Sequence, residues 1–171
     1  MATLAGQTQR TAAKSLAPDS YERFLAIAAG LLFVTILLAL AKGQSQWADL
    51  PTVVWGHLAT VMTALALTPV MLLRPRGDTT HRMLGRVWVA AMFLTAVESF
   101  FVRFSNHGNF SFIHLISAYV VIVTPILWWS ARTHRIAAHR SQVRGMVTGA
   151  LLIAGFFTLP FGRLLGRWLF A

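Results

Sequence analysis

Five long apolar runs constrain what this chain can fold into. They cover residues 24–41, 52–73, 83–102, 110–131 and 145–162. Each run is close to the length of about 20 residues that a helix needs to cross the hydrocarbon core of a bilayer. Only 12% of the 171 residues are charged and the mean hydropathy is +0.62, whereas about 25% of a typical soluble domain is charged. The sequence therefore predicts an all-α integral membrane protein with five transmembrane helices.

The segment before the first run, residues 1–23, is polar and is interpreted as a leader outside the membrane. The leader is long and the first run already has spanning length, so we interpret this run as a retained helix and not as a signal peptide. Residues 24–171 then form a single transmembrane domain. The connections are short, which favours antiparallel neighbours.

Lysine and arginine are distributed unevenly between the two sides of this predicted topology. Eleven of the fifteen fall in the leader and in the connections after the second and fourth runs. The positive-inside rule therefore places the amino terminus in the cytoplasm and the carboxyl terminus outside. This rule also accounts for the net charge of +10. The basic residues form no continuous face, so a nucleic-acid partner is not expected.

The second and third runs resemble the fourth and fifth in sequence. "HLATVMTALALTP" begins at His57 and "HLISAYVVIVTP" begins at His114, and each is followed by the motif H-R-x-x-x-R, "HRMLGR" at His81 and "HRSQVR" at His139. Two helices per copy restore the direction of the chain. The pattern thus predicts a pseudo-twofold repeat about the membrane normal, a four-helix bundle with one added amino-terminal helix.

The repeat predicts two pairs of equivalent histidines. His57 and His114 would lie near the outer end of the bundle, and His81 and His139 at its cytoplasmic foot. Imidazole inside a bilayer is uncommon and normally faces the bundle interior with a partner, so these pairs are candidate cofactor-binding residues.

The stretches "WGHLATVMTALALTPVMLLRPRGDTTHRMLGRVWV", "HLIS" and "AAHRSQVRGMVTGALLIAGFFTLPFGRLL" resemble a bacterial family of predicted multi-pass membrane proteins. That family is filed as a domain of unknown function, series number 2306. The resemblance covers roughly residues 52–167 and includes the four histidines, whereas Glu98 departs from the small residues usual there. It implies a multi-pass protein of a bacterial inner membrane and gives no reaction.

Three functions compete for the histidines. The first is a redox-associated membrane subunit in which paired imidazoles bind haem b or a quinone. The second is a metal or proton site formed by His57, His114 and Glu98, since two histidines and a carboxylate are a plausible ligand set. In the third, the H-R-x-x-x-R arginines bind lipid head groups in a non-enzymatic accessory protein, with a protein partner or a second copy of the chain. These arginines are Arg82, Arg86, Arg140 and Arg144.

The chain has no cysteine, which excludes disulfides, thiolate metal sites and covalent haem attachment. It also has no nucleophile motif and no glycine-rich phosphate loop. A hydrolase or kinase is therefore not supported, and whether the protein is an enzyme at all stays open.

Overall fold

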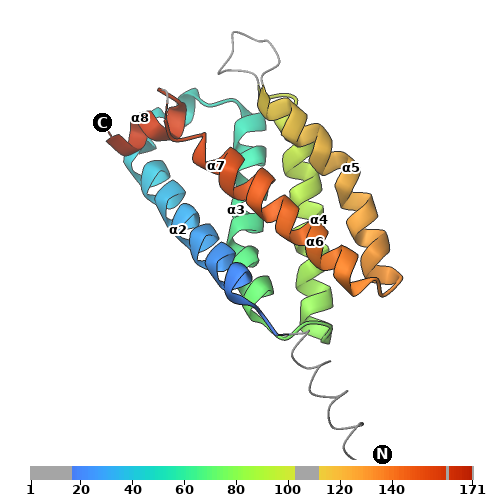
Figure 1. The fold of residues 1–171 in the computed structure, drawn as a ribbon. Coiled ribbons are helices and arrows are strands. Elements are labelled where there is room, and N and C mark those ends of the chain that lie inside the picture. Colours follow the sequence, from blue (N-terminus) through green and yellow to red (C-terminus); the bar gives the residue numbers. More distant parts are fainter. Residues whose placement is uncertain (1–16, 103–111, 161, 171) are drawn as a thin grey trace, which may run out of the picture.

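The computed structural model describes residues 17–102, 112–160 and 162–170, and within these ranges the chain is helical with no strand. Four long helices come first: α2 (Ser20–Lys42), α3 (Thr52–Leu73), α4 (Thr79–Ser99) and α5 (Phe112–Arg132). A 3₁₀ segment, η1 (Gln44–Asp49), joins the first two. Most of the predicted leader and the connection before α5 lie outside the described residues (Figure 1).

The last helical stretch has three consecutive parts. Helix α6 (Ile136–Met146) continues through a π-helical segment, η3 (Val147–Ile153), into the short α7 (Ala154–Phe156). After a turn, α8 (Leu164–Phe170) closes the chain. The sequence predicted a span over 145–162, but this helix begins earlier and ends at Phe156. Pro160 follows soon after and has no backbone N–H to continue a helix.

Two aspartates fix where helices begin at one end of the bundle. Asp19 caps α2: its side chain accepts from the backbone N–H of Glu22 at 3.0 Å, and the Glu22 carboxylate accepts from the Asp19 N–H at 3.1 Å. Asp78 caps α4 by accepting from the His81 N–H at 2.6 Å. Such caps satisfy amide groups that the helix leaves unpaired. The two caps therefore place Glu22 and His81 in the first turn of α2 and of α4.

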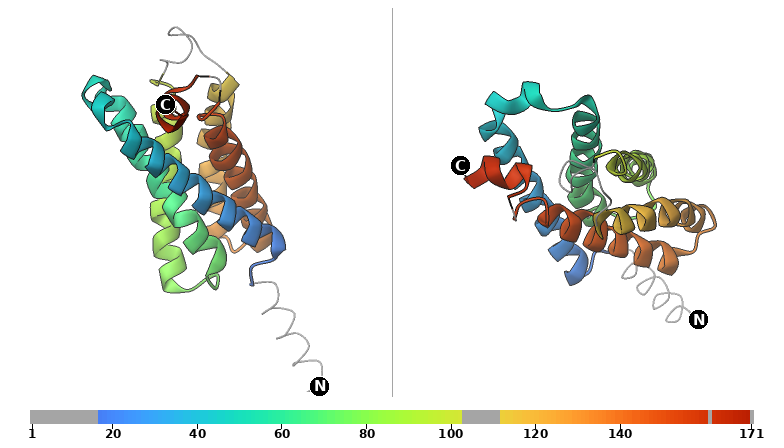
Figure 2. Two further views of the ribbon diagram at one scale, coloured as in Figure 1. Left: turned by 90° about the vertical axis from the view of Figure 1, so that its left-hand side faces the viewer. Right: turned by 90° about the horizontal axis from the view of Figure 1, so that it is seen from above.

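The helices pack as a bundle with α2 laid across it (Figures 1 and 2). Helix α3 packs on α4, α4 on α5 and α5 on α6, while η3 returns to contact α3; α2 covers α3 and η3, and α8 packs on α2. The core contains fully buried Leu65, Met92 and Leu127. This arrangement places α4 and α6 on opposite sides of the bundle interior.

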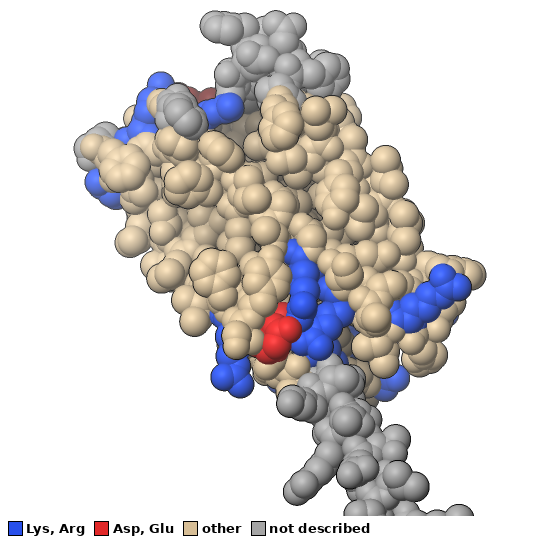
Figure 3. All heavy atoms as spheres, in the orientation of Figure 1, with Lys and Arg blue, Asp and Glu red and all other residues tan. Residues whose placement is uncertain are grey.

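The outside of the bundle is strongly apolar. Leu31 on α2 and Ile122 on α5 are 65% and 63% exposed. Charged side chains gather at two ends of the face in Figure 3, and the surface between them is mostly uncharged. Large apolar surfaces of this kind on soluble monomers are rare. Such a surface fits contact with lipid.

Three helices, α2, α3 and α5, are long and apolar enough to cross a membrane. This confirms the predicted membrane class by length and composition. Helix α4 and the α6–η3–α7 stretch are not in this group. Each begins with an H-R-x-x-x-R motif, which adds charge to its first turns. The count of five spans therefore remains a prediction.

Candidate ligand-binding pocket

A pocket of about 320 Å³ lies at the end of the bundle where α4 and α6 begin. We call this the arginine-rich end, because five arginines line the pocket there. They are Arg76, Arg82, Arg86, Arg132 and Arg140. The only carboxylate among the lining residues is Glu22. The pocket thus has an excess of positive charge and favours a ligand with electron-rich or anionic groups.

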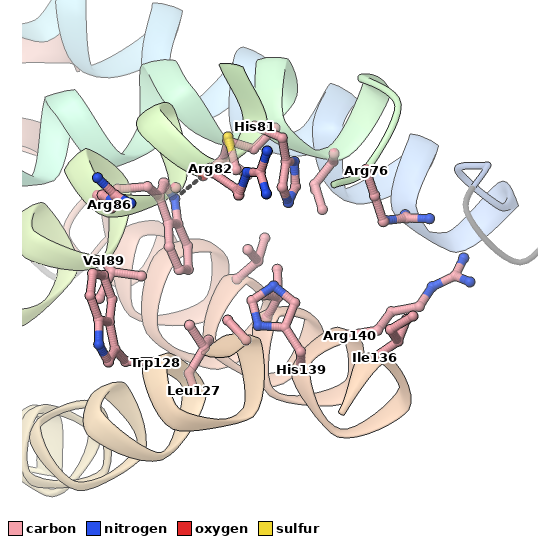
Figure 4. A pocket seen from close by; sticks show the side chains of 18 of the residues that line it. Arg76, His81, Arg82, Arg86, Val89, Leu127, Trp128, Ile136, His139 and Arg140 are labelled. Atoms are coloured by element: carbon pink, nitrogen blue, oxygen red, sulfur yellow. Dashed lines mark hydrogen bonds between the residues drawn. The ribbon is translucent and has the colours of Figure 1, made fainter. Parts of the chain in front are cut away.

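His81 and His139 enter this pocket from opposite sides, one from α4 and one from α6 (Figure 4). Each lies in the first turns of its helix, as the shared motif predicted. The Nδ1 atom of each ring is buried and has no hydrogen-bond partner among the described residues. An unpaired buried polar atom is costly, and buried groups in native proteins are usually satisfied. Both rings line one pocket, while their Nδ1 atoms lie against the protein interior.

Burial favours the neutral form of both imidazoles. Burial lowers the pKa of His81, and the neighbouring His139 lowers it further, against the opposing effect of Asp78. Burial also lowers the pKa of His139, partly offset by the backbone of Leu127. Both residues precede the apolar runs of their helices. A neutral imidazole offers one N–H donor and one acceptor nitrogen, so the pair can hydrogen-bond to carbonyl or hydroxyl groups.

The inner wall of the pocket is apolar and aromatic. Trp88 is only 4% exposed, and its indole N–H donates to the Thr68 hydroxyl at 2.9 Å. The hydroxyl of Thr68 in turn donates to the carbonyl of Ala64 at 2.7 Å. Leu127 and Val147, both buried, complete this wall. The pocket thus combines an apolar, aromatic wall with two imidazoles.

Arg140 and Arg144 are engaged within the protein. The side chain of Glu22 is 1% exposed and accepts from Arg140 at 2.6 Å and 2.8 Å, and from Arg144 at 3.1 Å and 3.2 Å. Arg76 also bonds to Glu22, and Arg144 to Asp19. The sequence predicted that Arg140 and Arg144 bind lipid phosphates. The structure pairs both with the carboxylates of Glu22 on α2 and of its N-cap Asp19, and lipid binding by these two arginines stays a prediction.

Arg82 and Arg86 differ from Arg140 and Arg144, because they make no ion pair with a described residue. Both are exposed on α4 and line the pocket, and neither has an ion-pair partner in the described part of the chain. Of the four arginines predicted to bind head groups, these two are placed to do so.

Glu22 was missed as a site residue by the sequence analysis. The signal was its rarity: the chain has five acidic residues against fifteen basic ones, and Glu22 stands directly before an apolar run. A carboxylate in that position is expected to have a cationic partner. Its partners could not be identified without the fold, because they lie 54 to 122 residues away in the sequence.

The outer histidines, His57 and His114, contact α4 or the residue that caps its end. The Nδ1 atom of His57 lies 3.2 Å from the carbonyl oxygen of Thr95. Close by, the Thr60 hydroxyl donates to Glu98 at 2.7 Å and accepts from Thr95 at 2.9 Å. This network places Glu98 next to His57.

His114 is 6% exposed, and its ring packs against Phe100 with 6.0 Å between centroids. Among the described residues, no three His, Asp or Glu side chains are grouped so that they could hold a metal ion. The predicted set of His57, His114 and Glu98 therefore gains no support as a metal site. A haem between His57 and His114 likewise stays a prediction.

The fold and pocket define a helical protein with three helices able to cross a membrane and a basic, histidine-lined pocket at one end. Comparisons with protein-family models, with curated proteins and with solved structures found no match.

Proposed function

We propose that this chain is a membrane subunit that binds a quinone-class ligand between His81 and His139. The observation that carries the proposal is the pair of imidazole rings that reach one pocket from α4 and from α6. A quinone head group is a flat ring with carbonyl oxygens on opposite edges. It can accept hydrogen bonds from imidazoles on two sides and pack on Trp88. When bound, a quinone supplies the capacity to take up and release electrons and protons.

The charges around the pocket support this choice of ligand. Arg82 and Arg86, which have no ion-pair partner among the described residues, can stabilise negative charge at the head group, while Arg76 and Arg140 share the one carboxylate of Glu22. A pocket of about 320 Å³ is near the lower limit of ligand pockets, about 300–1,000 Å³. This size suits a single or fused ring better than a porphyrin. Haem b between these histidines is therefore the weaker form of the redox proposal.

We further propose the five-span topology and the repeated hairpin. In support of the repeat, α4 and α6 each contribute one histidine to the same pocket. Thr68 and Thr124 occupy matching places in α3 and α5, are both buried, and both donate to the carbonyl four residues earlier. These correspondences support a pseudo-twofold relation. The arginine-rich end then faces the cytoplasm of a bacterial inner membrane.

A second function, the binding of a lipid head group without a reaction, is favoured by one observation. Arg82 and Arg86 are spaced one turn apart on α4 at the arginine-rich end, where phospholipid phosphates would lie. In this form the protein would be an accessory protein that contacts lipid, and a membrane-protein partner, through its basic face.

An absorption spectrum and a binding titration separate these functions. The detergent-purified protein is recorded oxidised and then reduced with dithionite, and its organic extract is analysed for quinone. A tailless benzoquinone or naphthoquinone is then titrated against tryptophan fluorescence. We expect saturable quenching that His81→Leu and His139→Leu each weaken, whereas His57→Asn at the other end of the bundle leaves it unchanged.

Other results would contradict the quinone proposal. A Soret band that shifts on reduction would indicate haem. Quenching that is equal in all three variants would show that the histidine pocket does not bind the quinone. Retention of an anionic phospholipid that depends on Arg82 and Arg86, with no quinone binding, would favour the second function.

A further inference from the structure

A second hollow adjoins the pocket on the outside of the bundle. It has a volume of about 390 Å³ and lies between α4 and α5. Arg86, Val89 and Trp128 line both the pocket and this hollow. Beyond them the lining becomes apolar, with Ala90 and Phe93 on α4 and Pro125 on α5. We call this hollow the α4–α5 groove.

We propose that the ligand of the pocket is an amphiphile whose long apolar chain lies in the α4–α5 groove and which enters sideways from the membrane. This inference rests on the proposed function and specifies the ligand class further, as a quinone with a hydrocarbon tail. The two cavities are adjacent, because Arg86, Val89 and Trp128 line both of them.

The polarity of the two cavities matches the two parts of such a ligand. The histidines and all but one of the charged lining residues belong only to the pocket, and Arg86 is the only charged residue of the groove. From Arg86 to Phe93 is seven residues, or about 10 Å along a helix axis. The groove therefore leads a chain away from the polar head and along the apolar flank of α4, where lipid would surround it.

Ala90 gives a means to close the groove without touching the pocket. It lines the groove only, and its small side chain leaves the space that a chain would occupy. Ala90→Phe should fill this space. Val87 is 47% exposed on the same helix and lines neither cavity, so Val87→Phe is a matched control that adds a phenylalanine elsewhere.

The test compares two quinones with the same head group, one without a tail and one with a decyl chain, on purified protein in the same detergent. In Ala90→Phe we expect binding of the decyl quinone to weaken about tenfold or more, because the added ring and the chain cannot occupy one space. Binding of the tailless quinone should stay within about twofold, since its site is the pocket. Val87→Phe should bind both quinones as the wild type does.

Each other outcome is decisive. If Ala90→Phe weakens both quinones equally, or neither, the chain does not lie in the groove. If phosphatidylglycerol displaces the decyl quinone but not the tailless one, the groove is a site for membrane lipid and the inference fails while the proposed function stands. If the tailless quinone does not bind the wild type, the proposed function itself fails. Ala90→Leu repeats the comparison with a smaller side chain in case the phenylalanine variant does not fold.

Discussion

Glu22 and Arg140 form a two-point ion pair across 118 residues of sequence, with Nε–Oε1 at 2.6 Å and Nη2–Oε2 at 2.8 Å. The pair joins the start of α2 to α6. Arg76, in the connection between α3 and α4, bonds to the same carboxylate. One buried side chain thus holds together the first helix and both predicted copies of the hairpin. A geometry with paired N–H donors on one carboxylate is among the stronger polar contacts in proteins.

Removing the Glu22 carboxylate is expected to destabilise the protein markedly. Glu22→Ala leaves Arg76 and Arg140 without their acceptor, and breaking one side of a buried pair costs about 3–5 kcal/mol. We expect the lower end, about 3 kcal/mol, since the arginines keep part of their surface in solvent. Thermal unfolding in detergent measures the effect. Asp49→Ala, at an exposed carboxylate of η1, is the control and should change little. Equal melting temperatures for the two variants would contradict the prediction.

Stability should fall as the pH drops below about 6.5. The folded state lowers the pKa of His81 and His139 from the ordinary value of 6.5, so the unfolded chain takes up protons first. This loss begins as the pH falls through 6.5 and ends below the folded pKa values. Among the charged neighbours, Arg76 and Arg74 lower the pKa of His81 and Asp78 raises it. Arg76 also lowers the pKa of His139.

The measurement for this pH effect is the melting temperature between pH 8 and pH 5, compared with the double variant His81→Gln, His139→Gln. The melting temperature of the double variant should depend less on pH between pH 8 and pH 5. The lowered pKa values of Asp19 and Asp78 act only below about 3.8 and so do not interfere. A wild-type slope of zero or of the opposite sign would show that the two imidazoles are not neutral in the folded protein.

Gly166 should be needed for the close packing of α8. A Cβ placed there would lie 1.6 Å from the carbonyl oxygen of Leu159. Gly166→Ala must therefore displace the backbone, and overpacking of this kind costs about 1–3 kcal/mol. Gly149→Ala is the matched control, because a Cβ there meets nothing within 4 Å. Limited proteolysis should cut the carboxyl-terminal segment faster in Gly166→Ala than in Gly149→Ala. Equal cutting rates would indicate that α8 does not depend on this contact.

The carboxyl terminus should lie outside the cytoplasm. Eleven of fifteen lysines and arginines fall on the predicted cytoplasmic side. In the structure α8 packs at the far end of α2, where Lys42 donates to the carbonyl of Leu169 at 2.6 Å. A reporter that is active only outside the cytoplasm, fused after residue 171, should be active. A reporter fused after Trp129, near the arginine-rich end of α5, should be inactive. The reverse pattern would contradict the predicted orientation, and equal activity at both sites would mean that a span was miscounted.

The sequence by itself was sufficient to place the long apolar helices and the inner histidines. The runs 52–73 and 110–131 correspond closely to α3 and α5, because helix length and apolar composition are local properties. The motif H-R-x-x-x-R, with Asp78 as a cap before its first copy, places each histidine in an early helical turn. The predicted fifth run extends to residue 162, whereas the α6–η3–α7 stretch ends at Phe156, since apolar composition continues past the point where the backbone turns.

Only the tertiary structure decided which polar groups meet. His57 lies against the Thr95 carbonyl, 38 residues away, and Arg140 and Arg144 pair with Glu22. Spacing in the sequence cannot report such pairings, because they depend on how helices cross. His81 and His139 face one cavity for the same reason: composition predicts that each lies in a helix, and packing determines what each ring faces.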